Sequence, residues 1–154
     1  MAGNPLAGKR PKLKAPVFRQ MTEDTRFHID YDWWDKSTMD LRAYLATRLQ
    51  ALGIDDVQFD ETVDEIDVVD METGEVHRVD GFQYVVQTYF SQLPDDFAQR
   101  SSLVDAVFCV LLANANQPMR VTNIADKIGR SADVVLKTLN GPRIYQGISP
   151  VFDD

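Results

Sequence analysis

The stretch VTNIADKIGRSADVVLKTL, residues 121–139, decides how the C-terminal part of this chain folds. It predicts two short helices joined by a tight turn. Thr122 is a suitable cap for the first helix, and Gly129 supplies the left-handed residue that ends it. The buried side of that helix is formed by residues at helical spacing: Ile124, Ala125 and Ile128. Because a glycine stands between the two apolar runs, the chain can reverse sharply there.

The second helix of the pair starts at Ser131, whose hydroxyl is a favourable helix cap. Val135 and Leu139 lie one turn apart and face inward. Residues 119–121 predict a short strand before the pair. After the turn at residues 140–142, the sequence RIYQGISPV predicts a strand or a short hairpin about Gly147.

Upstream, residues 101–116 (SSLVDAVFCVLLANAN) predict a helix that begins at Ser101 or Ser102. This helix is apolar on nearly every side, which is typical of a central core element. Together, residues 101–152 resemble a winged helix-turn-helix domain through the pattern Ile-Ala-x-x-Ile-Gly-x-Ser at 124–131.

The resemblance implies DNA binding, since the second helix of the pair enters the major groove in that family. Residues from Ser131 onward would lead toward DNA. Lys137 suits a phosphate or a guanine, and Asn140 suits an adenine. Arg130 and Arg143 would hold phosphates. The resemblance also admits a protein-interaction module, because winged helices serve in that role too.

One feature of the second helix competes with DNA contact. Asp133 precedes Lys137 by four residues, the favourable order for a surface ion pair on a helix. Arg130 also stands at a turn position that is more often apolar.

Charge is distributed unevenly along the 154 residues, whose net charge is −8. Residues 1–20 carry five basic side chains and no acid. Residues 21–100 carry 6 basic and 19 acidic side chains, and residues 101–154 carry five of each. The predicted helix-turn-helix is therefore nearly neutral beside a strongly acidic segment. Phosphate contacts supply much of the affinity for DNA, so the basic N-terminal segment matters for a DNA-binding hypothesis.

Residues 1–22 contain three prolines and few large apolar groups, which predicts a disordered basic arm. Three interpretations stay open for this arm. It can be a solubilising tail, it can track a phosphate backbone or enter a minor groove, or it can lie on the acidic middle of its own chain.

Residues 23–100 predict an acidic α+β region. Apolar and polar residues alternate in RFHIDYDWW, residues 26–34, which predicts a strand. Its polar face would carry His28, Asp30 and Asp32, a set that can ligate a divalent metal or simply face solvent. A helix opened by Asp35 or Ser37 and ended by Gly53 should follow.

The segment 55–80 holds eleven acids against Arg78 alone, and its second half predicts a hairpin that turns at Thr73 and Gly74. This acidic surface is the alternative functional site, a docking face for a basic protein partner. Asp80 should cap a helix with an aromatic face that runs to Pro94, and that face is a candidate homodimer surface.

The fold class is therefore α+β, arranged as a basic arm (1–22), an acidic region (23–100) and a winged helix-turn-helix (101–154). No apolar run of membrane-spanning length occurs, and no signal peptide is expected. The single cysteine, Cys109, lies in an apolar helix and predicts a buried thiol in a reducing, cytoplasmic setting. Phosphate-loop and nucleophile motifs are absent from the sequence, so neither an enzyme nor a cofactor is predicted.

Overall fold

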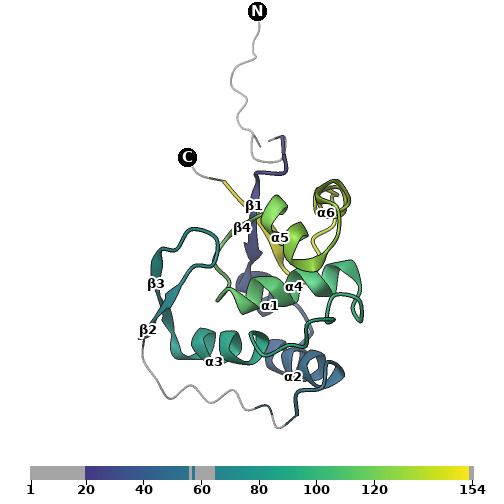
Figure 1. Cartoon of the computed structure of the whole chain (residues 1–154). Helices are drawn as coiled ribbons and strands as arrows, with labels where there is room; N and C mark the ends of the chain where they lie inside the picture. Colours follow the sequence, from purple (N-terminus) through teal and green to yellow (C-terminus); the bar gives the residue numbers. More distant parts are fainter. Residues whose placement is uncertain (1–19, 56, 58–64, 153–154) are drawn as a thin grey trace, which may run out of the picture.

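The computed structural model describes residues 20–55, 57 and 65–152. It confirms the α+β class. Helix α4 (Leu103–Ala113) crosses the middle of the molecule, with α5 (Val121–Ile128) and α6 (Ala132–Leu139) on one side of it (Figure 1). Helices α2 (Leu41–Ala51) and α3 (Gly81–Phe90) lie on the other side.

A small antiparallel sheet joins the two ends of the described chain. Strand β1 (Arg26–Ile29) lies between β4 (Met119–Arg120) and β5 (Ile148–Val151). Arg26 is opposite both Arg120 and Val151. The short strand predicted at residues 119–121 is thus confirmed, but β5 pairs with β1 rather than folding back about Gly147 as a hairpin. The carbonyl of Gly147 instead accepts a hydrogen bond from the backbone of Asp30, 2.7 Å away.

The strand predicted over residues 26–34 is wrong beyond Ile29. Asp30 ends the strand and caps helix α1 (Tyr31–Asp35), because its carboxylate accepts a hydrogen bond from the backbone of Asp32. His28, Asp30 and Asp32 consequently do not line one face of a strand. Among the described residues no cluster of three metal-ligating side chains occurs. The aspartate that looked like a ligand is a helix cap.

Helix α2 also begins later than predicted. Its cap is Asp40, which accepts from the backbone of Arg42, and not Asp35 or Ser37. The end of the helix is as expected, because Gly53 has a φ of 95° in the left-handed region.

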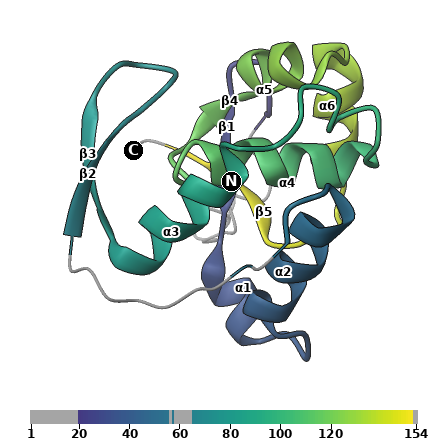
Figure 2. The ribbon, with the colours of Figure 1, turned by 60° about the horizontal axis from the view of Figure 1, so that its bottom comes forward.

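The acidic hairpin and the helix that follows it are confirmed, although the helix α3 ends at Phe90 and not at Pro94. Strand β2 (Glu65–Val69) pairs with β3 (Val76–Asp80), and the turn contains Gly74 with a φ of 79°. Asp80 caps α3 by accepting from the backbone of Gln83 at 2.8 Å. Figure 2 shows this hairpin at one flank of the molecule, next to α3.

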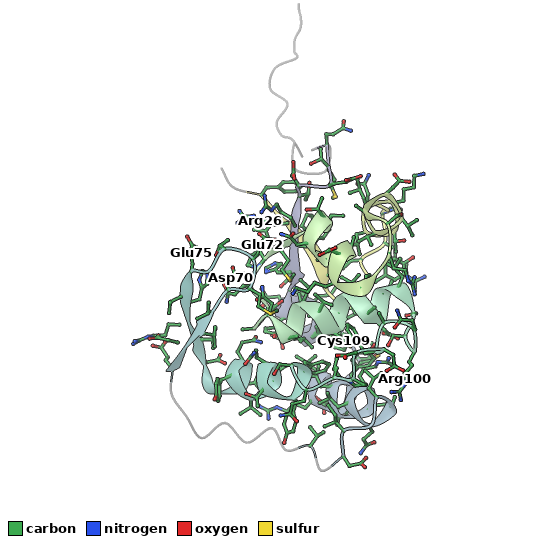
Figure 3. The ribbon with its side chains drawn as sticks, in the orientation of Figure 1. Arg26, Asp70, Glu72, Glu75, Arg100 and Cys109 are labelled. Carbon is green, nitrogen blue, oxygen red and sulfur yellow. The ribbon has the colours of Figure 1, made fainter. Side chains whose placement is uncertain are left out.

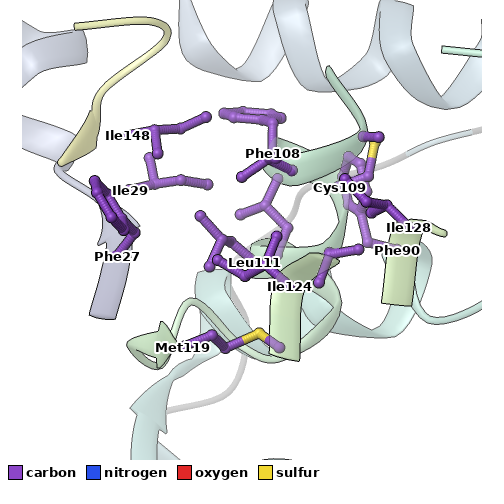
Figure 4. Close-up of a cluster of buried hydrophobic side chains, with 14 of the residues drawn as sticks. Phe27, Ile29, Phe90, Phe108, Cys109, Leu111, Met119, Ile124, Ile128 and Ile148 are labelled. Carbon is purple, nitrogen blue, oxygen red and sulfur yellow. The ribbon is translucent and has the colours of Figure 1, made fainter. Parts of the chain in front are cut away.

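One core unites the described chain, as the side chains in Figure 4 illustrate. Phe27 and Ile29 of β1 are buried with Phe108 of α4, Ile124 of α5 and Ile148 of β5. The expected boundary between residues 100 and 101 therefore passes through a shared core and a shared sheet. Strand β1 belongs structurally with the C-terminal segment, although that segment begins at residue 101, 72 positions after Ile29.

Helix α4 is buried on all sides, as predicted. Ser102 caps it, and every residue from Ala106 to Leu112 is buried. Near its start, Asp105 accepts hydrogen bonds from Tyr44 and from Gln146 and pairs with Arg48 at 3.5 Å. These contacts tie the loop after α6 to α2.

Candidate nucleic-acid interface

The α5–α6 pair has the local geometry that its sequence predicts. Gly129 ends α5 with a φ of 70°, and the Arg130 backbone donates to the Ala125 carbonyl at 3.1 Å. The Ser131 hydroxyl accepts from the Val134 backbone at 3.1 Å and so caps α6. Val135 and Leu139 are buried, which fixes the opposite side of α6 toward solvent.

The structure places the five predicted DNA-contacting residues along the exposed side of α6 and at its two ends. Arg130 and Ser131 stand before its first turn, Lys137 lies on its outer surface, and Asn140 follows its last residue. An eight-residue helix is about 12 Å long, so these groups form a stripe and not a compact cluster. Arg143 is exposed three residues after Asn140, and its guanidinium lies 5.2 Å from the ring centre of Tyr145.

Lys137 is engaged within its own helix. Its ammonium group lies 3.1 Å from the Asp133 carboxylate, and the two side chains are 76% and 63% exposed. The predicted i,i+4 ion pair is confirmed. Exposed pairs of this kind contribute little to stability, so a phosphate can compete for the lysine.

The sequence did not point to Lys127, although it lies exposed on α5 near the same turn. Within the described part of the chain Lys127 forms no ion pair. Lys127 lies in the last turn of α5, where a basic side chain interacts favourably with the helix dipole. That structural role is enough to explain a lysine at this position, so the sequence does not single it out for binding.

The start of α5 is held by residues from two remote segments. The Glu72 carboxylate, from the hairpin turn, accepts from the Arg120 backbone and from the Asn123 amide, both at 2.7 Å. The backbone N–H of Val121 donates to the Thr25 carbonyl, and the backbone N–H of Thr122 donates to the Glu23 carbonyl. Thr122, the predicted cap, is therefore not the cap of α5. Arg120 occupies the cap position, where its side chain makes no capping hydrogen bond and instead lies 3.6 Å from the Glu72 carboxylate.

These contacts also place the start of the described chain next to α5. Residues 1–19, which hold all five basic side chains of the arm, lie outside the described residues. The chain becomes described at Gln20, only three residues before the Glu23 carbonyl that bonds α5. The attachment point of the basic segment is thus beside α5.

The part of the chain that contains α5 and α6 is also more basic than the part before it. Residues 119–152 contain five basic and two acidic side chains, whereas residues 27–118 contain five basic and 18 acidic ones. Basic residues of the first group are Arg120, Lys127, Arg130, Lys137 and Arg143.

Several acids of the alternative docking face are structural. Asp70 is buried and the side chain of Glu72 is only 3% exposed, while Figure 3 shows Glu75 projecting from the hairpin. Asp70 accepts from the backbone of Glu72 and from the Asn114 amide. Four other acids, Asp56, Asp60, Glu61 and Asp64, lie outside the described residues.

A separate apolar cavity of about 410 Å³ lies between α3, α4 and α5. Phe90, Leu93, Phe97 and Cys109 line it, and Lys127 lies at its border. Burial raises the pKa of the Cys109 thiol to about 12, so it is protonated at neutral pH and a poor nucleophile. The prediction of a buried cysteine is confirmed.

Comparisons of this chain with protein-family profiles, curated proteins and solved structures gave no match. No described helix is long and apolar enough to span a membrane.

Proposed function

We propose that this protein is a regulatory DNA-binding protein that uses α5 and α6 as a winged helix-turn-helix and residues 1–22 as a basic arm. The observation that carries the proposal is the bonding of the arm's attachment point to the first turn of α5. The arm and the exposed residues of α6 can therefore engage one duplex. The arm supplies charge that α6 lacks, since phosphate neutralisation drives affinity.

In this proposal α6 occupies the major groove. Asn140 reads a base edge, Lys137 exchanges Asp133 for a phosphate or a guanine, and Arg130 and Arg143 contact phosphates at the two ends of the helix. Strand β5 leads away from the loop that carries Arg143 and pairs with β1, so the wing of this chain consists of that loop rather than a hairpin.

The binding of labelled random-sequence duplexes, measured by fluorescence anisotropy at low and at physiological salt, tests the proposal. Binding should weaken steeply with salt, because each phosphate contact contributes a slope of about −0.9 in a plot of log K against log salt. Arg130→Ala and Arg143→Ala should each reduce that slope by about one unit. Absence of binding at low salt would overturn the proposal.

A charge-matched pair of variants separates a specific α6 contact from a general charge effect. Asp133→Asn frees Lys137, whereas Asp96→Asn frees Arg100 from an equivalent i,i+4 pair next to α2. Both changes add one unit of positive charge. Asp133→Asn should tighten DNA binding severalfold and Asp96→Asn should leave it nearly unchanged. Equal effects of the two variants would exclude α6 as the binding element.

The alternative is a protein-interaction adaptor that docks a basic partner on region 55–80. Its exposed described acids include Glu65 and Asp67, but both already lie close to the Arg78 guanidinium, at 3.9 and 3.1 Å. Capture of a basic protein that is lost on charge reversal at Asp64, Glu65 and Asp67, together with no DNA binding, would favour the adaptor.

A further inference from the structure

The outer edge of β3 carries backbone groups that no described residue pairs. The Asp70 backbone N–H donates to the Glu75 carbonyl at 2.7 Å, so these two residues form a hydrogen-bonded pair at the end of the hairpin. Opposite residues of an antiparallel ladder alternate between bonded and non-bonded pairs. Val69–Val76 and Asp67–Arg78 are consequently non-bonded pairs. The N–H and C=O groups of Val76 and Arg78 therefore point away from β2.

A cavity of about 280 Å³ lies along this edge. It is bounded on one side by Arg78, Val79 and Asp80 of β3, and on the other by the loop of residues 115–117 after α4. This volume is about that of two amino-acid residues. Within the described chain no backbone hydrogen bond crosses from β3 to the loop.

The loop is held apart from β3 by its bonds to another strand. The Asn116 side chain accepts from the Ile29 backbone at 2.7 Å and donates to the Ile29 carbonyl at 2.8 Å. Ala115 and Asn116 both have positive φ values, 56° and 57°, which non-glycine residues rarely adopt. The loop is thus fixed to β1 in a strained form, and the space beside β3 stays open.

An unpaired buried donor also lines this cavity. Gln83 is only 7% exposed, and its side-chain oxygen accepts a hydrogen bond from the Tyr31 hydroxyl. Its amide nitrogen has no partner among the described residues. A buried amide donor without an acceptor is costly, so the floor of this cavity is a locally unfavourable part of the fold.

Charge and exposed apolar surface indicate the chemistry of that ligand. On the outer face of the hairpin, Glu65, Asp67 and Asp80 are exposed beside Arg78 alone. The Val69–Val76 pair on the same face is 63% exposed at each residue, which is unusual for valine. Both features suit a strand whose side chains on that same face are basic beside Arg78 and Asp80 and apolar beside Val76, which are every second residue of the strand.

We propose that an extended basic segment of a partner protein adds to β3 as a third strand. Its backbone bonds to the outward groups of Val76 and Arg78, as in other cases of strand addition to a free edge. Its basic side chains face the acids of the hairpin, and an apolar side chain covers Val76. The inference is independent of DNA binding.

The probe for this site is a labelled peptide of six residues that carries lysine, lysine and valine at alternate positions with threonine between them, titrated against the full chain. A peptide of the same sequence with N-methyl groups on alternate residues has the same charge but cannot complete a strand ladder. The unmodified peptide should bind at least tenfold more tightly. Equal binding of the two peptides would show simple charge attraction and would overturn the proposal.

Two proline variants identify the edge. Arg78→Pro removes an N–H group from the β3 edge, and Asp67→Pro removes the corresponding group from the β2 edge of the same non-bonded pair. Arg78→Pro should abolish peptide binding, whereas Asp67→Pro and Arg78→Ala should retain it within about threefold. Circular dichroism checks that both proline variants stay folded. If either one unfolds, the N-methyl comparison still decides the outcome.

Two further results would overturn the proposal. Loss of binding in Asp67→Pro but not in Arg78→Pro would assign the peptide to β2. Zero-length cross-links within one chain, between the lysines of residues 1–19 and the hairpin acids, would show that the chain itself supplies the occupant. Arg78→Pro should bind DNA as the wild-type protein does, whether or not it binds the peptide. Failure of the strand-addition proposal is therefore distinguishable from failure of the proposed DNA-binding function.

Discussion

Helices α5 and α6 are adjacent, have eight residues each, and begin in opposite ways. Helix α6 is capped by its own preceding residue, Ser131. Helix α5 has no local side-chain cap, and its first-turn donors bond to Glu72, Thr25 and Glu23. One helix is therefore specified by its neighbours in sequence. The other depends on segments about 50 and about 100 residues away.

The largest effect that would sharpen this comparison is expected at Glu72, whose side chain is 3% exposed. Glu72→Ala leaves the Arg120 backbone and the Asn123 amide without their acceptor. We expect a loss of about 3 kcal/mol in the free energy of unfolding, measured by urea denaturation, since a buried unpaired donor costs about 1–3 kcal/mol. Glu72→Gln keeps one acceptor oxygen and should lose about half as much.

The matched control is Glu75→Ala in the same hairpin. The Glu75 side chain is 70% exposed and its charged contact is with His77 at 3.7 Å. Substitutions at exposed positions usually change stability by no more than about 0.5 kcal/mol. A loss at Glu75 equal to that at Glu72 would mean that hairpin charge, rather than the bond to α5, stabilises the protein.

A smaller effect is expected for the local cap of α6. Ser131→Ala should cost about 1 kcal/mol, the usual value for a lost helix cap. Thr122→Ala removes the corresponding hydroxyl from α5 and should cost less than half of this, because the hydroxyl of Thr122 is not the cap. Thermal denaturation of both variants measures the difference. A larger loss for Thr122→Ala would contradict the finding that the Thr122 hydroxyl does not cap α5.

The same division explains what the sequence could predict. Elements with a local signal were predicted well: Ser131 before α6, Asp80 before α3, Gly129 after α5, and the hairpin turn at Gly74. The class of the fold followed from these elements. Helix α4 was evident because an apolar sequence on all sides admits only a buried position.

Features that depend on distant residues could not be predicted. Alternation in residues 26–34 continued past Ile29, yet the Asp30 backbone bonds to Gly147 and its side chain caps α1. Nothing in residues 26–34 reveals that contact. The placement of β1 between β4 and β5 is equally non-local.

The candidate interface was predicted in part. Sequence spacing located Arg130, Lys137 and Arg143 and also the Asp133–Lys137 pair. It missed Lys127, and it could not show that the basic segment begins beside α5, because that depends on backbone bonds from Thr25 and Glu23. The Gln83 amide of the β3 cavity gave no signal in the sequence, since a glutamine in an amphipathic helix normally faces water.

The smallest effect concerns the N-terminal segment that supports α5 and carries His28. Burial lowers the pKa of His28 below its usual 6.5, and the nearby Asp30 carboxylate opposes that change only partly. The unfolded chain therefore binds this proton more readily than the folded protein. Stability from the neutral ring is complete above about pH 6.5 and is lost as the pH falls through the lowered pKa of the folded state.

Between pH 7.5 and pH 5.5 the wild-type protein should lose more stability than His28→Gln, which has no proton to bind in this range. The difference between the two proteins isolates His28, because every other titrating group is common to both. Parallel curves of unfolding free energy against pH would show that protonation at this position costs nothing. A difference confined to the acidic side would instead show that protonation of His28 destabilises the folded protein.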